Sequence, residues 1–159
     1  MRPHRLRVRH KNFDSREGVP ELHVRVERTV RFGEVDAARI MWHGHYASWL
    51  EDGREALGRR YGISYTDFLE HDVIVPVKLL QLNFRRPLCY GQTYVIHAML
   101  LWNEAATLDF SYYIEDAEGS ITTTASTTQL MLGLDGNLLL EQPEFYRLFC
   151  EGWRKGIPL

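Results

Sequence analysis

The chain has 159 residues, of which 45% are hydrophobic, 12% aromatic and 25% charged, and its formal net charge is −2. It is long enough for one domain with a buried core and too short for two full domains. The near-neutral charge argues against a general attraction to nucleic acid or anionic membranes. No apolar run reaches the length of about 18 residues that a membrane-spanning helix needs.

The sequence begins with MRPHRLRVRHK, which carries five Arg or Lys side chains and no acidic one. Such a stretch could be a transit peptide or an anion-binding arm. It has no apolar segment, however, and acidic side chains follow at Asp14 and Glu17. We therefore expect a disordered, solvated tail over residues 1–22 and a single domain over residues 23–159.

The two cysteines, Cys89 and Cys150, lie far apart and fit no metal-binding spacing. Two unpaired thiols in a reducing compartment explain them best. We therefore expect a cytoplasmic protein.

In residues 24–32 the four apolar side chains all stand at even positions, and every odd position is charged or polar. Period two with one polar face predicts a half-buried strand. From Tyr46 the apolar residues recur at helical spacing, which predicts a helix of about four turns. Gly53 lies within this stripe and weakens a helix by about 1 kcal/mol relative to Ala, so we expect another backbone to pack close to it. The stripe consists of Tyr46, Trp49, Leu50, Gly53 and Leu57.

The remainder is predicted to be mostly strand. TDFLEHD (66–72) predicts a short helix capped by Thr66, and Pro76 indicates an edge or a bulge in the strand that follows. PEFYRLFCEGW (143–153) predicts a closing helix with Pro143 at its start. The strands are expected over 73–84, 92–103, 107–116 and 121–134, with turns at AEGS and LDGN.

Consecutive strands joined by tight turns favour an antiparallel meander over parallel crossover units. The long amphipathic helix then has one place to bury its stripe, which is the concave face of that sheet. The sequence therefore predicts an α+β fold in which an antiparallel sheet wraps around one long central helix.

A carboxylate and two imidazoles, Asp36, His43 and His45, crowd the short connection between the first strand and this helix. Phosphate-loop, zinc-protease and nucleophile-elbow motifs are absent. The three side chains could bind a metal together, but no further ligand set accompanies them.

This connection, RFGEVDAARIMWHGHY (31–46), resembles the hotdog-fold thioesterases, in the branch of 4-hydroxybenzoyl-CoA thioesterase and the short-chain acyl-CoA thioesterases. Their pattern is a strand followed by [FY]-x-[DE]-x-D-x-x-G-[IV]-[VM]-[FYW]-[HY]-x-N-Y and a long helix. NFRRPLCYGQTYVI (83–96) is similar to the family's strand, Pro and Gly before the next strand. The element order agrees from residue 24 to about residue 140.

The resemblance implies the hotdog fold and the hydrolysis of acyl-CoA or acyl-carrier-protein thioesters, without a cofactor beyond the coenzyme A or phosphopantetheine of the substrate. Asp36 matches the family's catalytic carboxylate, which acts as nucleophile or as general base. His43 matches the position whose backbone N–H donates to the thioester oxygen, and Tyr46 matches the Tyr that begins the helix. The candidate substrate-binding residues are Tyr46, His45, Arg85 and Arg86, with the arginines placed to hold phosphates of coenzyme A.

Two positions depart from the family pattern: Arg39 replaces its Gly and His45 replaces its Asn. Both bear on the shape of the loop and hence on substrate choice, whereas Asp36 is retained. The chemistry itself needs a carboxylate on one side of the carbonyl and hydrogen-bond donors on the other. A helix N-terminus supplies such donors, each worth about 3 kcal/mol.

Alternatives stay open at this point. A hydratase or dehydratase would need an H-F-P or Asp-x4-His motif that does not occur, and a non-catalytic acyl-binding module is the third interpretation. Glu51 and Asp52 lie where other hotdog thioesterases keep a catalytic Glu, although a solvated or subunit-contact role is the simpler expectation.

Aromatic, short-chain, branched and carrier-bound thioesters are all compatible with the sequence. Exposed sheet edges invite pairing with a second copy, and the resemblance implies a homodimer or a dimer of dimers. The aromatic side chains that could line a pocket, or simply fill the core, are Trp42, Trp49, Tyr61 and Trp102.

Overall fold

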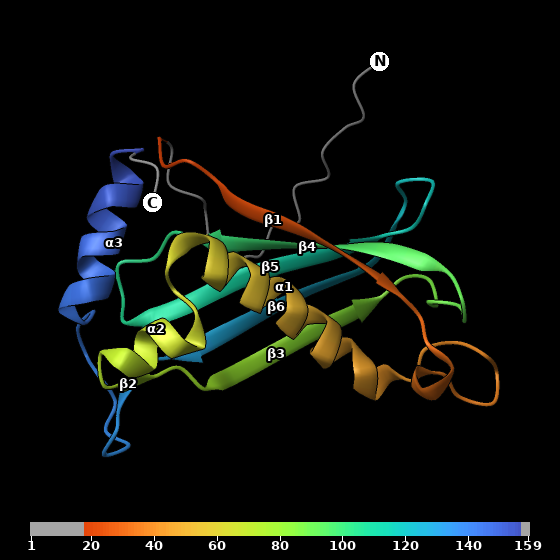
Figure 1. The fold of residues 1–159 in the computed structure, drawn as a ribbon, viewed down its shortest axis with the longest axis horizontal. Coiled ribbons are helices and arrows are strands. Elements are labelled where there is room, and N and C mark those ends of the chain that lie inside the picture. Colours follow the sequence, from red (N-terminus) through yellow and green to blue (C-terminus); the bar gives the residue numbers. More distant parts are fainter. Residues whose placement is uncertain (1–17, 157–159) are drawn as a thin grey trace.

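The computed structural model describes residues 18–156, so the predicted basic tail over residues 1–17 and the last three residues lie outside the described part. The protein folds as a five-stranded antiparallel sheet with a long helix across one face (Figure 1). The elements are β1 (Leu22–Thr29), α1 (Tyr46–Tyr61), α2 (Tyr65–Glu70), β2 (Val73–Ile74), β3 (Val77–Phe84), β4 (Thr93–Leu101), β5 (Thr107–Glu115), β6 (Ile121–Leu130), β7 (Leu132–Gly133) and α3 (Glu144–Arg154). Two short 3-10 turns, η1 (Phe32–Glu34) and η2 (His43–His45), lie between β1 and α1.

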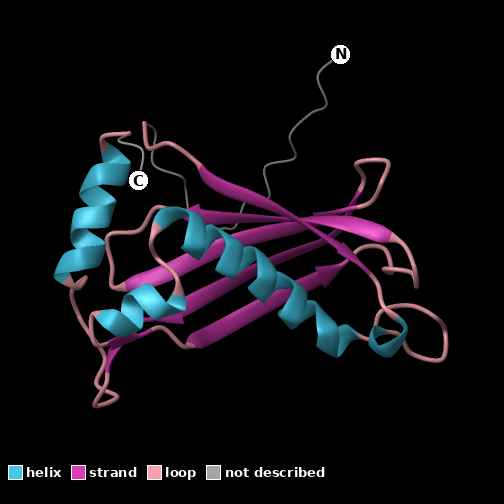
Figure 2. Cartoon of the chain, viewed as in Figure 1, coloured by secondary structure: helices cyan, strands magenta, loops and turns pink. Residues whose placement is uncertain are grey.

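The strand order in the sheet is β1-β4-β5-β6-β3, with every neighbouring pair antiparallel. Only β4, β5 and β6 form a simple meander. Because α1 and α2 carry the chain away from β1, strand β3 joins the opposite edge, and β4 then returns to pair with β1. The predicted α+β architecture is confirmed, and Figure 2 shows α1 lying on one face of the sheet with α2 and α3 toward one end.

The predicted apolar stripe of α1 is confirmed, since all five of its residues are buried. Gly53 is needed for a close approach to β4: a Cβ atom there would lie 3.0 Å from the Cβ of Ala98 and 3.4 Å from a methyl group of Ile96. The sequence suggested that another backbone packs close to Gly53. The close neighbours are instead side chains of β4. The helix packs onto the sheet at the distance that this small residue permits.

Arg54 is a buried residue that the helical pattern placed off the stripe. It is completely buried; its Nε–H donates to the side-chain oxygen of Gln129 at 2.9 Å, and one Nη donates to the carbonyl of Ile63 at 3.0 Å. Burial lowers the pKa of this guanidinium, against the opposing influence of neighbours that include Tyr65. The guanidinium carbon also lies 4.9 Å from the centre of the Phe110 ring, so the cation is partly held by aromatic faces.

Two local predictions are corrected. The short helix α2 is capped by Ser64 instead of Thr66, because the Ser64 hydroxyl accepts from Asp67 N while the Asp67 carboxylate accepts from Ser64 N, a capping box. The expected strand over 73–84 is interrupted before Pro76, which has no N–H to donate. The first piece, β2, pairs with β7, and the second, β3, is an edge strand as the proline indicated.

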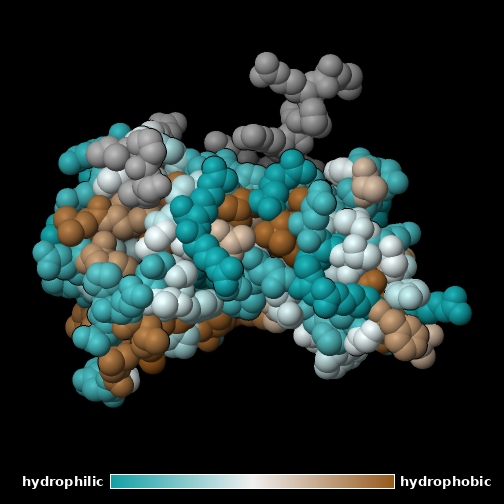
Figure 3. Space-filling model, viewed as in Figure 1, coloured by the Kyte–Doolittle hydropathy of each residue, from teal (hydrophilic) through white to brown (hydrophobic). Residues whose placement is uncertain are grey.

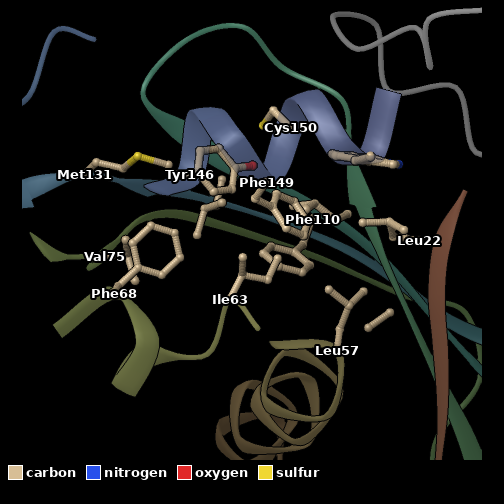
Figure 4. Close-up of a cluster of buried hydrophobic side chains, with 14 of the residues drawn as sticks. Leu22, Leu57, Ile63, Phe68, Val75, Phe110, Met131, Tyr146, Phe149 and Cys150 are labelled. Carbon is tan, nitrogen blue, oxygen red and sulfur yellow. The ribbon is translucent and has the colours of Figure 1, made fainter. Parts of the chain in front are cut away.

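The C-terminal helix α3 covers one end of the core (Figure 4). Pro143 is its N-cap and not its first helical residue. Its buried side chains pack with Phe68 and Ile63 from the region around α2. They are Tyr146, Phe149, Cys150 and Trp153.

The packed core includes residues at the N-terminal end of the described part. β1 begins at Leu22, which is buried, and Val19 packs against the same core. Cys89 and Cys150 are free thiols, as predicted. Within residues 18–156, no helix combines the length and apolar character needed to cross a bilayer.

Candidate active site

Residues 34–42 form a small hairpin that carries Asp36 near its tip. Trp42 N donates to the carbonyl of Glu34 at 2.9 Å, and Asp36 N donates to the carbonyl of Ile40 at 3.0 Å. These two bonds fix the register of the arms. The loop that the sequence placed between a strand and a helix is therefore an ordered ladder, and Asp36 has a defined position in it.

The turn at the hairpin tip depends on Asp36 itself. Its carboxylate accepts from Ala38 N at 2.8 Å and its carbonyl accepts from Arg39 N at 2.9 Å. Arg39 has a φ of 60°, a left-handed conformation that costs a non-glycine residue about 1 kcal/mol or more. This is the position of the family's glycine, so the substitution leaves the backbone in the conformation that glycine would favour.

The start of the helical region lies beside this tip. Neither Trp42, which precedes η2, nor His45, which precedes α1, forms a side-chain cap. The first N–H groups of a helical segment have no partner within it, and the helix dipole makes this end positive. Backbone donors at His43 and Gly44 are therefore available to an anion in the space in front of them.

An open pocket of about 380 Å³ lies between the hairpin tip, the start of α1 and the end of β3. It brings together every predicted site residue except His45. Ile40, Met41 and Phe84 give it apolar walls, while a carboxylate and two guanidinium groups give it charged ones. The full lining is Asp36, Ile40, Met41, His43, Tyr46, Phe84, Arg85, Arg86 and Pro87.

Tyr46 forms a buried wall of the pocket. Its ring meets Phe84 edge-on with a centroid distance of 4.8 Å. Burial raises the pKa of its phenol, although the backbone of Leu88 and the hydroxyl of Thr123 act in the opposite direction. Tyr46 therefore stays protonated at neutral pH and contributes shape and a neutral dipole.

Arg85 and Arg86 are placed by the backbone at the end of β3. Both of their N–H groups donate to the carbonyl of Thr122, at 2.9 and 3.0 Å. The Arg86 guanidinium lies 3.7 Å from the carboxylate of Asp116 and is 63% exposed. The pair thus presents two well-hydrated cations at the mouth of the pocket.

His45 lies on the other side of the connection. Its ring packs edge-on against Trp42, with centroids 5.7 Å apart. Within the described residues, no group of three or more His, Cys, Asp or Glu side chains is arranged as a set of metal ligands. The suggested metal cluster of Asp36, His43 and His45 is therefore not formed.

The alternative acids and aromatics of the sequence lie outside the pocket lining. Glu51 accepts a hydrogen bond from the Tyr65 hydroxyl at 2.9 Å, and Asp52 forms an ion pair with Arg28. Trp49 is fully buried, and Trp102 packs against Trp153. Trp42 and Tyr61 also do not line the pocket.

Glu34 is a residue that the sequence reasoning did not single out. Its carboxylate accepts from Arg28 Nη2 at 2.9 Å, Trp49 Nε1 at 3.0 Å and Arg31 N at 2.9 Å. Burial alone would raise its pKa, but these hydrogen bonds and the charge of Arg28 outweigh burial and hold the pKa below its ordinary value. The available signal was its place two residues before Asp36, where the family pattern also has an acid.

Comparison with known proteins gives one family. Residues 30–147 match the model of the thioesterase-like superfamily. A Bacillus subtilis protein named "Putative acyl-CoA thioesterase YneP" is 30% identical over 110 residues, which are 69% of this chain and 80% of that protein. A 1,4-dihydroxy-2-naphthoyl-CoA hydrolase of Prochlorococcus marinus is 32% identical over 76 residues, 43% of this chain and 49% of that one.

Solved structures agree with this family at the level of the fold. A DHNA-CoA thioesterase from Staphylococcus aureus superposes with a TM-score of 0.75 at 23% identity, over 84% of this chain and 90% of that one. A protein of Thermus thermophilus superposes with a TM-score of 0.72 at 26% identity, over 81% and 98%. The chain therefore belongs to the thioesterase-like superfamily and has its hotdog fold.

Proposed function

We propose that the protein hydrolyses acyl-CoA thioesters in the pocket between the hairpin tip and the start of α1. The observation that carries this proposal is that one pocket is lined both by Asp36, which has a carboxylate, and by His43, which begins a helical turn without a side-chain cap. A thioester carbonyl placed between them would meet a nucleophile or base and an oxyanion site together. The relative named "Putative acyl-CoA thioesterase YneP" supports the same reaction.

Two routes fit Asp36. In the nucleophilic route its carboxylate attacks the carbonyl carbon, the C–S bond breaks, and the thiolate of coenzyme A leaves and takes up a proton. Water then hydrolyses the resulting mixed anhydride. In the general-base route Asp36 takes a proton from water as that water attacks. In both routes the N–H groups near His43 stabilise the oxyanion, each donor being worth about 3 kcal/mol. Neither route uses a metal or redox cofactor.

The substrate is held at its polar end by Arg85 and Arg86. Guanidinium groups bind phosphates with paired, charge-assisted hydrogen bonds. Both arginines line the pocket that contains Asp36, so one coenzyme A molecule could reach them and the carbonyl site together. The apolar walls of the pocket suit a compact aromatic or short-chain acyl group, and related proteins include a 1,4-dihydroxy-2-naphthoyl-CoA hydrolase.

We propose further that the working form is a homodimer formed along β3. This strand is at the edge of the described sheet, and an unpaired edge is a template for another strand. Its exposed apolar side chains include Val77, Leu79, Leu80 and Phe84. In Figure 3, apolar surface gathers along the lower left margin, in the part of the molecule that holds β2 and β3. Phe84 also lines the pocket, so a partner paired along β3 would lie beside the site.

The test is thiol release from a panel of aromatic, short-chain and branched acyl-CoAs, with Asp36→Asn beside the wild type. Asn keeps the oxygen that accepts from Ala38 N but cannot act as base or carboxylate nucleophile. Asp135→Asn is the matched control, because Asp135 makes the same kind of turn bond, to Asn137 N, away from the pocket. We expect kcat/KM to fall by about 10²-fold or more in Asp36→Asn only.

Equal activity of Asp36→Asn and the wild type would remove Asp36 from the mechanism. If the wild type hydrolyses none of the acyl-CoAs but binds one of them tightly, the non-catalytic acyl-binding module is favoured instead. If the protein hydrolyses acyl-carrier-protein thioesters but no acyl-CoA, the acyl group of its substrate is carried by a carrier protein and not by coenzyme A.

A further inference from the structure

The carboxylate of Glu34 joins three parts of the chain that surround the pocket. Its Oε1 accepts from Arg28 on β1 and from Trp49 on α1, and its Oε2 accepts from Arg31 N. Its backbone carbonyl accepts from Trp42 N across the hairpin. One residue therefore connects the first strand, both arms of the hairpin and the central helix.

We propose that Glu34 is a positioning residue that fixes the distance between Asp36 and the donors at the start of α1. The inference rests on the proposed function, because it concerns the same carboxylate and the same helix end. Glu34 is two residues from Asp36 on one hairpin arm, a separation of about 7 Å in extended chain. Its other attachment, Trp49, lies one turn inside α1.

The attachment is rigid because each partner is itself held. The Glu34 side chain is only 12% exposed and that of Arg28 is 19% exposed. Arg28 also forms an ion pair with Asp52 and places its guanidinium 5.1 Å from the centre of the Trp49 ring. A charged acceptor with donors from two elements in a partly dry environment is costly to move.

Small displacements at such a position have large catalytic effects. A misplacement of about 1 Å between reacting groups can reduce a rate by about 10²-fold. Glu34→Gln is the sharpest variant, because the amide nitrogen must face either Arg31 N or the donors of Arg28 and Trp49. Only one oxygen then remains to accept from Arg28, Trp49 and Arg31 N, so at least one of these donors loses its partner. The hairpin is then held less firmly and can shift.

A purely structural role for Glu34 predicts something different. Asp52 forms an ion pair with the same arginine, and no described hairpin residue forms a hydrogen bond with its carboxylate. Asp52→Asn therefore removes an Arg28 ion pair on α1 while leaving the hairpin attached. The two variants should lose similar stability, but only Glu34→Gln should change the geometry of the site.

The first measurement is steady-state kinetics on the best acyl-CoA of the panel, with thermal unfolding of each variant. We expect Glu34→Gln to lower kcat by about tenfold to 10²-fold with KM changed by less than about threefold, and Asp52→Asn to keep kcat within about twofold. Equal kcat values for Glu34→Gln and the wild type, or equal losses in the two variants, would overturn the proposal. If Glu34→Gln does not fold, Trp49→Phe removes the Nε1 donor together with part of a buried ring system, and should lower kcat in the same way to a smaller extent.

The second measurement does not depend on activity. Amide hydrogen exchange should become about tenfold faster at Asp36 and Arg39 in Glu34→Gln, since their N–H groups close the hairpin tip, and should stay unchanged there in Asp52→Asn. Unchanged exchange at the tip would also overturn the positioning role. A wild type that hydrolyses nothing would end the proposed function, whereas the exchange result would still decide whether Glu34 holds the hairpin.

Discussion

Gly44 lies directly beneath the indole ring of Trp42, so that a Cβ atom at position 44 would overlap three carbon atoms of the ring. The ring leaves no room for a side chain at position 44, which directly follows the pocket-lining residue His43 at the start of the helical region. An oxyanion site built from the N–H groups near His43 depends on this backbone keeping its position.

Gly44→Ala should therefore impair catalysis more than folding. The added methyl group must displace Trp42 or the backbone near His43, and we expect kcat/KM to fall by about 10²-fold on the acyl-CoA panel. Gly33→Ala is the matched control, since no atom lies within 4 Å of a Cβ at that position. Full activity of Gly44→Ala would show that the donors lie elsewhere.

Arg39 should tolerate glycine better than a branched side chain. Its φ of 60° is easy for Gly and strongly unfavourable for Val. We expect Arg39→Gly to change the free energy of unfolding by less than about 0.5 kcal/mol and Arg39→Val to lower it by about 1–3 kcal/mol, measured by urea denaturation. Similar losses for both would mean that the Arg39 side chain, and not its backbone, stabilises the tip.

The β3 edge predicts a change in oligomeric state. Leu79→Glu puts a charge on the exposed edge strand and should convert the proposed dimer to a monomer in light scattering after size exclusion. Leu140→Glu, at a residue that is 84% exposed and outside the sheet, is the control. A monomeric wild type would rule out the dimer directly.

His97 should make stability depend on pH. Burial lowers the pKa of this imidazole, while Glu115, 3.0 Å from its Nε2, raises it. With the lower pKa in the folded state, the unfolded chain binds a proton first as the pH falls below about 6.5. Unfolding free energy should therefore decrease from about pH 7 toward the folded pKa and then level off. The contribution should disappear in His97→Gln, measured by urea denaturation at each pH.

Cys150 should resist thiol reagents in the folded protein. Burial raises the pKa of its thiol to about 11, despite a hydrogen bond with Tyr146 that lowers it. Very little thiolate then exists at pH 8, and the thiolate is the reactive form. We expect Cys89, which is only partly buried, to react with a disulfide reagent first, and Cys150 to react only in denaturant. Equal rates of reaction of Cys89 and Cys150 with the reagent in the folded protein would contradict the burial of Cys150.

The elements with a clear local period were predictable from the sequence. The stripe of α1 and the alternation in β1 are local patterns, and the structure confirms them. The pairing of segments that are distant in the sequence leaves no periodic pattern within either segment, so it could not be predicted in this way. Asp36 and Arg85 could be associated only through a family resemblance, and the structure places both in one pocket.

The mistaken details have physical causes. The helical spacing left Arg54 off the apolar stripe of α1, but Gln129, 75 residues later, supplies an acceptor for it inside the core. Thr66 is a good cap in isolation, and only the reciprocal bonds between Ser64 and Asp67 favour the earlier residue. Glu34 was passed over because an acid after a strand is ordinary until its three donors are known.

The pairing of β1 with β4 has a consequence for how the protein is made. His23 lies opposite Met99 in the finished sheet, so the first strand leaves the ribosome well before its partner has been synthesised. Contacts of such sequence separation slow folding, while the β4–β5–β6 meander can form locally. We expect that meander to assemble first and β1 to join last, so that the nascent chain keeps an open strand during most of its synthesis.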